Sequence, residues 1–216
     1  MTSTLEVGCS PRFVVIEGAD RVGKDVQAKI LTERLVRSGV LAERFTTPDY
    51  STPVGQAISE HLRTHRLEGR TSAEARELEC LQAACRYQVA ARVRVAMSAG
   101  MWAVCARWWP SALVYGRLDG LVSPDWIVKT YADLLEPDLC VLLRAPSGDV
   151  ADRRGSDLYE AHAGRQSEIA VEYARMWEGL QAAGGDKKWA PVDAGGKSIR
   201  EVADSLWSVV AALLTS

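Results

Sequence analysis

The stretch Phe13-Val-Val-Ile-Glu-Gly-Ala-Asp-Arg-Val-Gly-Lys24-Asp25 decides how this chain is expected to fold. Its first four residues are an apolar run, which is typical of a buried parallel strand. The loop that follows, Gly18 to Lys24, fits the pattern G-x-x-x-x-G-K, and apolar residues at helical spacing come directly after it. A strand, a glycine-containing loop and a helix in this order predict a loop that binds phosphate groups.

The chemistry of this loop comes from its backbone and from one side chain. Gly18 and Gly23 permit a backbone geometry in which successive N–H groups converge on phosphate oxygens. The positive end of the following helix adds to the attraction. Lys24 would place a point charge on the β- and γ-phosphates, so the loop indicates a nucleotide phosphotransferase.

Asp25 stands where the loop pattern has Ser or Thr, whose hydroxyl normally binds Mg²⁺. A carboxylate can also bind Mg²⁺, and Asp25 is therefore the predicted metal ligand. Without a metal ion, a carboxylate about 4 Å from a phosphate charge would repel it by roughly 1–4 kcal/mol. Asp is also favourable at the start of a helix, where it would stabilise an empty loop. Asp25 indicates either a metal-dependent site or a weakened one.

Strand and helix patterns alternate along the rest of the chain. Four further apolar runs are candidate strands, at 42–46, 101–106, 139–143 and 189–192. Helical patterns lie between and around them, at 25–38, 54–64, 73–98, 124–134, 148–154, 166–183 and 199–214. This alternation predicts an α/β fold with a five-stranded parallel sheet flanked by helices on both faces.

The composition narrows the class of protein. With 216 residues and 47% hydrophobic content, the chain can bury the core of one domain, which we expect to span residues 1–216. A net charge of −2 offers no basic field for nucleic acid, and no apolar run is long enough to span a membrane. The five cysteines form no C-x-x-C pair, and we expect reduced, mostly buried thiols in an intracellular, cytoplasmic protein. His61 and His65 are expected to be solvated helix residues without a metal.

The loop and the segments behind it together resemble the thymidylate kinase family. Glu17 to Gln27 resembles the family's opening, E-G-x-D-x-x-G-K-[ST]-x-Q. Residues 106–116 resemble D-R-Y-x-x-S-x-x-[YF]-x-G, and residues 153–160 resemble the lid motif R-x-x-x-R-G-x-D-x-[YF]-E. Shorter matches keep the family's order at 48–49, 85–87, 135–139 and 192–199. The resemblance implies a three-layer P-loop NTPase fold with a short lid around residues 148–165.

The resemblance also implies an activity and a set of ligands. The activity would be transfer of the ATP γ-phosphoryl group to dTMP, or to a related deoxynucleoside monophosphate, with ATP and Mg²⁺ as cofactors. Family members commonly pair, so the expected partners are the nucleotide substrates and a second copy of the chain or a larger complex. The implied ATP-binding residues are Gly18, Ala19, Val22, Gly23, Lys24, Asp25 and Arg154. The implied acceptor-binding residues are Asp20, Asp49, Gln82, Arg86, Arg107, Ser111, Tyr115 and Tyr159.

The implied catalytic residues are Arg21, Lys24 and Asp20. Arg21, inside the loop, would neutralise charge on the transferring phosphoryl group together with Lys24. Asp20 would orient the acceptor nucleotide. Arg154, in the lid, would lie against adenine.

The acceptor site is implied to combine two arginines with contacts to the base and the sugar. Arg86 and Arg107 would hold the acceptor phosphate through forked hydrogen bonds. Ser111 would contact the base, and Tyr115 would pack against the deoxyribose.

Several departures from the family pattern fall on the chemistry. Besides Asp25, Ala106 replaces the acidic residue of D-R-Y, Gln82 stands where many members have a Phe stacked on thymine, and Tyr50 stands where some have an Arg. A lost stacking partner costs about 1–3 kcal/mol. If Asp25 and Ala106 face one Mg²⁺, the carboxylate missing at Ala106 is supplied again by Asp25.

Three hypotheses follow from these departures. In the first, the chain is a dTMP kinase. In the second, it is a kinase for a different acceptor, because Gln82 offers hydrogen bonds that Phe cannot. Alternatively it is a catalytically impaired homologue that serves as a binding or structural subunit. The third hypothesis would be favoured if the seven tryptophans were exposed at an interface.

Overall fold

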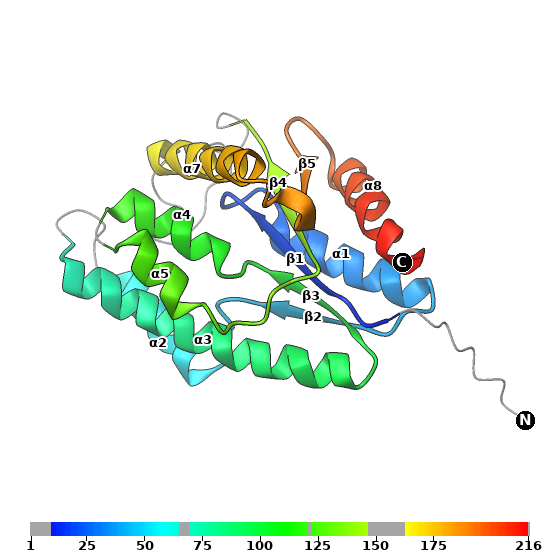
Figure 1. The fold of residues 1–216 in the computed structure, drawn as a ribbon, viewed down its shortest axis with the longest axis horizontal. Coiled ribbons are helices and arrows are strands. Elements are labelled where there is room, and N and C mark those ends of the chain that lie inside the picture. The colour runs from blue at the N-terminus through cyan, green and yellow to red at the C-terminus, as the bar shows by residue number, and fades with distance from the viewer. Residues whose placement is uncertain (1–9, 65–69, 121, 147–162, 216) are drawn as a thin grey trace, which may run out of the picture.

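A five-stranded parallel sheet lies between two layers of helices in the computed structural model, which describes residues 10–64, 70–120, 122–146 and 163–215 (Figure 1). The strands are β1 (Phe13–Gly18), β2 (Ala42–Thr46), β3 (Trp102–Ala106), β4 (Leu139–Arg144) and β5 (Trp189–Asp193). Their order in the sheet is β2-β3-β1-β4-β5, and every neighbouring pair is parallel. The predicted α/β fold is confirmed, and all five strands lie where their apolar runs indicate.

Helices cover both faces of the sheet (Figure 1). On one face lie α1 (Lys24–Arg37) and α8 (Ile199–Val210), which a 3₁₀ turn extends through Ala211–Thr215. On the other face lie α3 (Ser72–Ser98), α4 (Pro110–Asp119), α5 (Pro124–Thr130) and α7 (Ala163–Ala182). The remaining helix, α2 (Pro53–Thr64), packs against α3, and a 3₁₀ turn at Asp186–Lys188 precedes β5.

The central strand, β1, shows why the strands appear in the sequence as continuous apolar runs. Successive side chains of a strand point to opposite faces. Val14 and Ile16 pack in a cluster with residues of α1 and α8, whereas Phe13 and Val15 pack in another cluster with residues of α3, α4 and α5. All four are completely buried. Because both faces are covered, the run has no polar alternation.

Two helices differ from the expected pattern. Residues 110–119, for which no helix is predicted, form α4; Pro110 lies in its first turn and Gly120 caps its end with a φ of 63°. Pro at the start and Gly after the end are known helix boundary signals, so this helix was detectable. The helix predicted at 124–134 ends at Thr130. The helix predicted at 148–154 and nearly all of the predicted lid around 148–165 lie outside the described residues.

Burial decides several of the expectations about single residues. All seven tryptophans are buried or half-buried, so none of them provides the exposed interface that would favour a non-catalytic subunit. Cys85, Cys105 and Cys140 are buried free thiols, as expected, whereas Cys80 is exposed. His61 is only 5% exposed, so the prediction of a solvated side chain is wrong. Among the described helices, none combines the length and apolarity needed to cross a membrane.

The chain leaves β1 at a point that only glycine fits. Gly18 has a φ of 142°, and a Cβ atom there would lie 2.5 Å from the carbonyl oxygen of Leu143 in β4. Residues that carry a side chain rarely adopt this φ, and a backbone carbonyl cannot move aside as a flexible side chain can. The first glycine of the loop is therefore required by the packing of the sheet as well as by ligand chemistry.

Replacing this glycine should destabilise the protein. We expect Gly18→Ala to lower the free energy of unfolding by about 2 kcal/mol or more, from backbone strain and the close contact. Gly179→Ala is the matched control, since Gly179 lies within α7 and its added Cβ meets nothing within 4 Å. Ala in a helix is favoured over Gly by about 1 kcal/mol, so this variant should melt at a higher temperature. Equal melting temperatures of the two variants would contradict this account.

Candidate active site

The phosphate loop turns into α1 through residues with left-handed backbone conformations. Gly23 has a φ of 98° and Arg21 a φ of 63°. Lys24 is 3% exposed, and its Nζ donates hydrogen bonds to the carbonyl oxygens of Gly18 and Ala19, at 2.8 and 2.5 Å. Burial, reinforced by the positive charge of Arg107, lowers the pKa of Lys24 to about 7, even though Asp20 opposes the shift. The pKa of the loop lysine thus lies close to neutral pH.

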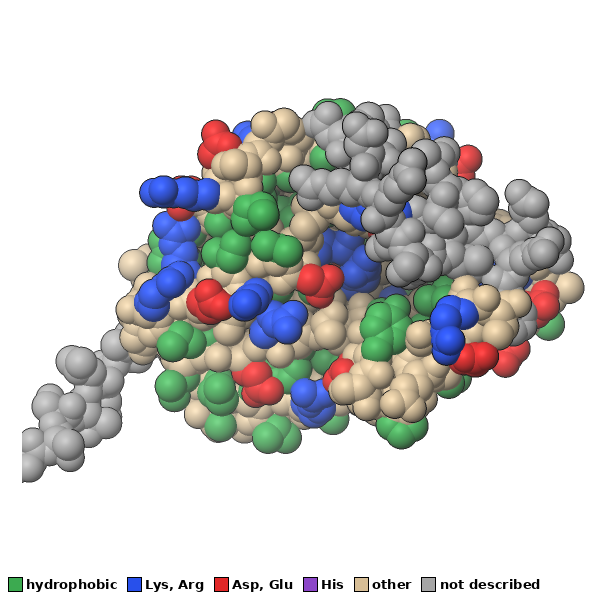
Figure 2. All heavy atoms as spheres, turned by 180° about the vertical axis from the view of Figure 1, so that it is seen from behind, with side chains coloured by type: hydrophobic (Ala, Val, Ile, Leu, Met, Phe, Trp, Pro, Cys, Tyr) green, Lys and Arg blue, Asp and Glu red, His purple; other side chains and the backbone are tan. Residues whose placement is uncertain are grey.

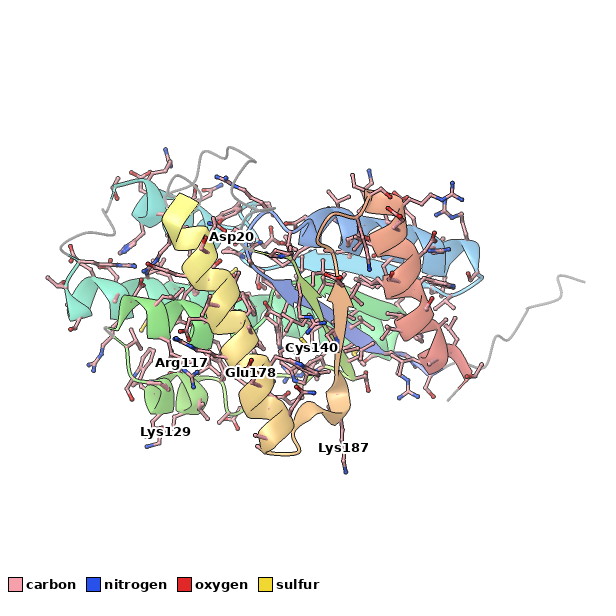
Figure 3. All side chains as sticks on the ribbon, turned by 90° about the horizontal axis from the view of Figure 1, so that it is seen from above. Asp20, Arg117, Lys129, Cys140, Glu178 and Lys187 are labelled. Atoms are coloured by element: carbon pink, nitrogen blue, oxygen red, sulfur yellow. The ribbon has the colours of Figure 1, made fainter. Side chains whose placement is uncertain are left out.

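Asp20 joins the loop to the opposite side of the site. Its carboxylate accepts hydrogen bonds from Arg107 Nη2 at 2.5 Å, from the Tyr115 hydroxyl at 2.7 Å and from Gln166 Nε2 at 3.4 Å. Lys24 Nζ lies 3.9 Å away. Figure 3 shows Asp20 beside the N-terminal half of α7. Burial raises the pKa of Asp20, but Arg107 and Lys24 outweigh it and bring the pKa to about 2, so the carboxylate is ionised.

Arg107 reaches a second carboxylate, that of Asp25. Arg107 directly follows β3, and its Nη1 lies 3.7 Å from Asp25 Oδ2. The Thr46 hydroxyl donates a hydrogen bond of 3.4 Å to the other oxygen of Asp25. Thr46 is the register partner of Ala106 across β2 and β3. Both contacts of Asp25 therefore come from residues adjacent to Ala106, the position where the sequence lacks an acidic residue.

Glu17 is a buried carboxylate that the sequence interpretation left without a role. It is 0% exposed, and it accepts hydrogen bonds from the backbone N–H of Trp108 at 2.7 Å and from the hydroxyls of Ser111 and Tyr173, both at 2.8 Å. A Glu within an apolar strand was the available signal, since a buried carboxylate needs such partners. Ser111, the predicted base contact, thus has its hydroxyl engaged with Glu17.

Arg86 lies in a polar cluster on α3. It is 2% exposed; its Nη1 donates to Glu79 Oε1 at 3.2 Å and to the Tyr131 hydroxyl, and its Nη2 donates to Gln82 Oε1 at 3.0 Å. The Tyr131 hydroxyl also donates to Glu79. Burial raises the pKa of Glu79, although Arg86 and Tyr131 oppose the shift. Glu79 was missed from the sequence, yet its spacing of seven residues from Arg86 puts both on one helix face.

A third ionic cluster contains His61, which the sequence predicted to be solvated. Arg70 donates to Asp119 at 3.2 Å, and Arg165 contacts the other oxygen of Asp119 at 2.5 Å. Arg70 Nη2 lies 3.3 Å from His61 Nε2. His61 is therefore buried because α2 brings it to an arginine that is held at the end of α4, a long-range arrangement that local spacing does not show.

One cavity of about 690 Å³ collects most of the predicted residues. Those lining it are Asp20, Arg21, Gly23, Lys24, Asp25, Gln82, Arg86, Arg107, Ser111 and Tyr115. Thr46, Arg70, Glu79 and Asp119 also line it and were not predicted. Figure 2 shows Lys and Arg side chains gathered in a hollow near the middle of one face of the molecule.

The other predicted residues do not line this cavity in the described part of the chain. The Asp49 carboxylate accepts hydrogen bonds from the backbone and hydroxyl of Ser51 and pairs with Arg92 at 2.6 Å. Gly18 and Ala19 contribute their carbonyls to Lys24 instead, and Val22 packs on the α1 side of the sheet. Arg154 and Tyr159 lie outside the described residues.

Comparison with known proteins places this arrangement in context. A sequence model of thymidylate kinases matches residues 16–206. The thymidylate kinase of Synechococcus sp. is 30% identical over 204 residues, covering 92% of this chain and 94% of the relative. The human thymidylate kinase is 27% identical over 196 residues, covering 90% and 87%. A solved thymidylate kinase from Candida albicans has the same fold, with a TM-score of 0.78 at 23% identity over 94% of this chain and 92% of that one.

The lowered pKa of Lys24 predicts a proton exchange on ligand binding. Phosphate charges would favour charged Lys24, so ATP binding at pH 8 should take up roughly one proton, and binding at pH 6 far less. Calorimetry in two buffers of different ionisation enthalpy measures this uptake. Lys24→Arg is the control, because arginine keeps its proton at both pH values and should bind without uptake. Equal binding heats in both buffers at pH 8 for the unsubstituted protein would contradict the lowered pKa of Lys24.

Proposed function

The chain belongs to the thymidylate kinase family, and from this premise we propose that it transfers the γ-phosphoryl group of ATP to dTMP or a related deoxynucleoside monophosphate. An oxygen of the acceptor phosphate forms a bond to the γ-phosphorus as the bond from that phosphorus to ADP breaks, giving ADP and the nucleoside diphosphate. One observation carries the proposal: in a single cavity, Asp20 holds both the loop lysine, Lys24, and the strand-end arginine, Arg107.

The phosphate loop would bind the donor and stabilise the charge that is transferred. Lys24 exchanges its bonds to the Gly18 and Ala19 carbonyls for oxygens of the β- and γ-phosphates. Arg21 lines the same cavity and supplies a second cation, which offsets charge on the transferring phosphoryl group. Both come from the turn that ends at Gly23, so the two cations approach the donor phosphates from one loop.

The acceptor side would be organised around Asp20. Two of the predicted acceptor residues, Arg107 and Tyr115, are bound to this carboxylate, which limits their freedom before the nucleotide arrives. Arg107 retains a partly exposed guanidinium that would bind the acceptor phosphate, and the ring of Tyr115 would pack against the deoxyribose. Pre-ordered contacts of this kind lower the entropic cost of bringing two phosphates together.

The residues present fit a magnesium ion that is shared with the nucleotide. Among the described residues, no group of three or more His, Cys, Asp and Glu side chains could hold a metal ion. Asp25 nevertheless lines the cavity with a carboxylate that is 54% exposed, next to the Thr46 hydroxyl. Mg²⁺ is usually held by one or two carboxylates, phosphate oxygens and water. When bound, the ion would offset phosphate charge, and Asp25 would hold it on the protein side.

The proximity of Asp25 to the neighbours of Ala106 supports the idea that one carboxylate replaces another. Thr46 pairs with Ala106 across the sheet, and Arg107 follows Ala106 in the chain. Both residues contact Asp25. An acidic side chain at Ala106 would therefore point into the same region. The local charge is then the same as in the family pattern, with the carboxylate moved from the end of β3 to the start of α1.

Activity is measured by incubating the purified protein with ATP, Mg²⁺ and dTMP and following ADP formation. We expect turnover that requires both nucleotides, and Lys24→Met should reduce kcat by about 100-fold or more, because it removes a charge at the transferring group. A protein that neither turns over dTMP or any other deoxynucleoside monophosphate nor gains thermal stability with ATP would contradict the proposed function.

The metal assignment is tested with two variants. Asp25→Ser should raise the Mg²⁺ concentration needed for half-maximal activity by about tenfold, as one carboxylate ligand is worth a few kcal/mol at most. The double variant Asp25→Ser/Ala106→Asp should recover most of the loss. If the double variant is no better than the single one, the carboxylates do not substitute for each other.

A further inference from the structure

Three polar side chains on one face of α3 line the cavity: Glu79, Gln82 and Arg86. They are three and seven residues apart, which aligns them along one side of the helix. Arg86 binds both of the others, so the three side chains form one connected unit, and Tyr131 supports it from the side. The hydrogen-bonding groups that this unit does not use internally are the ones that a ligand would meet.

The unused donors are on Arg86 and Gln82. Arg86 uses three of its five N–H groups within the unit, which leaves the Nε–H and one N–H of Nη2. The Nε–H of Arg86 is buried and has no hydrogen-bond partner among the residues that the structure describes. A guanidinium has no acceptor, so the oxygen of the Gln82 amide must be the atom that faces it. The NH₂ group of Gln82 is consequently left over, and the described part of the chain offers it no acceptor.

The unused acceptor is on Glu79. Oε1 of Glu79 receives the hydrogen bonds from both Arg86 and Tyr131. Oε2 makes no hydrogen bond within the described ranges. The α3 face therefore has unused donors on two residues, Arg86 and Gln82, and one unused acceptor on Glu79.

From this set we infer that the acceptor nucleotide of the proposed kinase carries a 6-oxopurine base, as in dGMP and dIMP, and that Gln82 determines this specificity. Guanine presents two neighbouring acceptors, N7 and O6, followed by the N1–H donor. N7 and O6 can accept hydrogen bonds from Arg86 and Gln82, and N1–H can donate one to Glu79. The inference rests on the proposed function, because it concerns the same acceptor site. It assigns Arg86 to the base, in place of the contact with the acceptor phosphate that the family resemblance implies.

Other bases satisfy the set less completely. Thymine offers O4 and N3–H, but a methyl group stands where guanine has N7, so dTMP remains a poorer substrate with one buried donor unpaired. Adenine and cytosine place an amino group where O6 would be, so a donor would face a donor. The expected order is therefore dGMP and dIMP, then dTMP, then dAMP and dCMP.

The cavity also has an apolar lining, which includes Leu62, Ala75, Leu78 and Val122. Gln82 is half-buried and stands where many family members have a stacking Phe, so an aromatic surface is replaced by an amide that carries a hydrogen-bond donor.

The first experiment compares kcat/KM, and the dissociation constant by calorimetry, for dGMP, dIMP, dTMP, dAMP and 7-deaza-dGMP. The last compound differs from dGMP only by loss of the N7 acceptor. We expect dGMP and dIMP to exceed both dTMP and 7-deaza-dGMP by about tenfold, the effect of leaving one buried donor unpaired. A preference for dTMP over dGMP, or equal values for dGMP and 7-deaza-dGMP, would overturn the inference.

The second experiment locates the effect in one side chain. Gln82→Leu keeps the approximate size and removes the donor, so it should reduce the ratio of dGMP to dTMP by about tenfold. Gln88→Leu, an exposed position on the same helix, should leave the ratio unchanged. Thermal melting confirms that both variants fold. An unchanged ratio in Gln82→Leu would exclude Gln82 as the determinant.

These results separate the inference from the proposed function. If no nucleotide is phosphorylated, phosphoryl transfer is excluded, and the dissociation constants still decide the base preference. If dTMP is phosphorylated and dGMP is not, the proposed function stands and the inference about the base is wrong.

Discussion

The buried carboxylate of Asp20 is the constraint on which the site depends. An ionised carboxylate cannot be buried without cations or hydrogen-bond donors around it. Lys24 from the phosphate loop, Arg107 from the end of β3, and Tyr115 from α4 supply them. The same contacts tie the phosphate loop to the end of β3 and to α4, so satisfying one charge brings together residues from three separate segments.

The departures at Asp25, Ala106 and Gln82 gain a physical meaning in this arrangement. Asp25 and Asp20 both contact the guanidinium of Arg107, so the added carboxylate does not stand alone against phosphate charge. Gln82 is tied to Arg86, a buried arginine that is itself held by Glu79 and Tyr131. Two of these departures, Asp25 and Gln82, therefore have polar partners within the site.

Much of the fold could be predicted from the sequence because it depends on local patterns. The apolar runs located all five strands, and helical spacing located most helices. The sequence analysis predicts no helix at α4, although Pro110 and Gly120 mark its ends. The motif residues of the phosphate loop and the strand-end Arg107 were found for the same reason: each lies directly beside a strand whose pattern is clear.

The sequence by itself determined the class of fold, the phosphate loop and the identity of the residues that depart from the family. Only the tertiary structure decided how the polar groups pair. Arg107 is 87 residues from Asp20, and Tyr173 is 156 residues from Glu17. Spacing predicts neighbours within one helix or strand, whereas such pairs are chosen by which buried charges must be satisfied once the sheet and helices have packed.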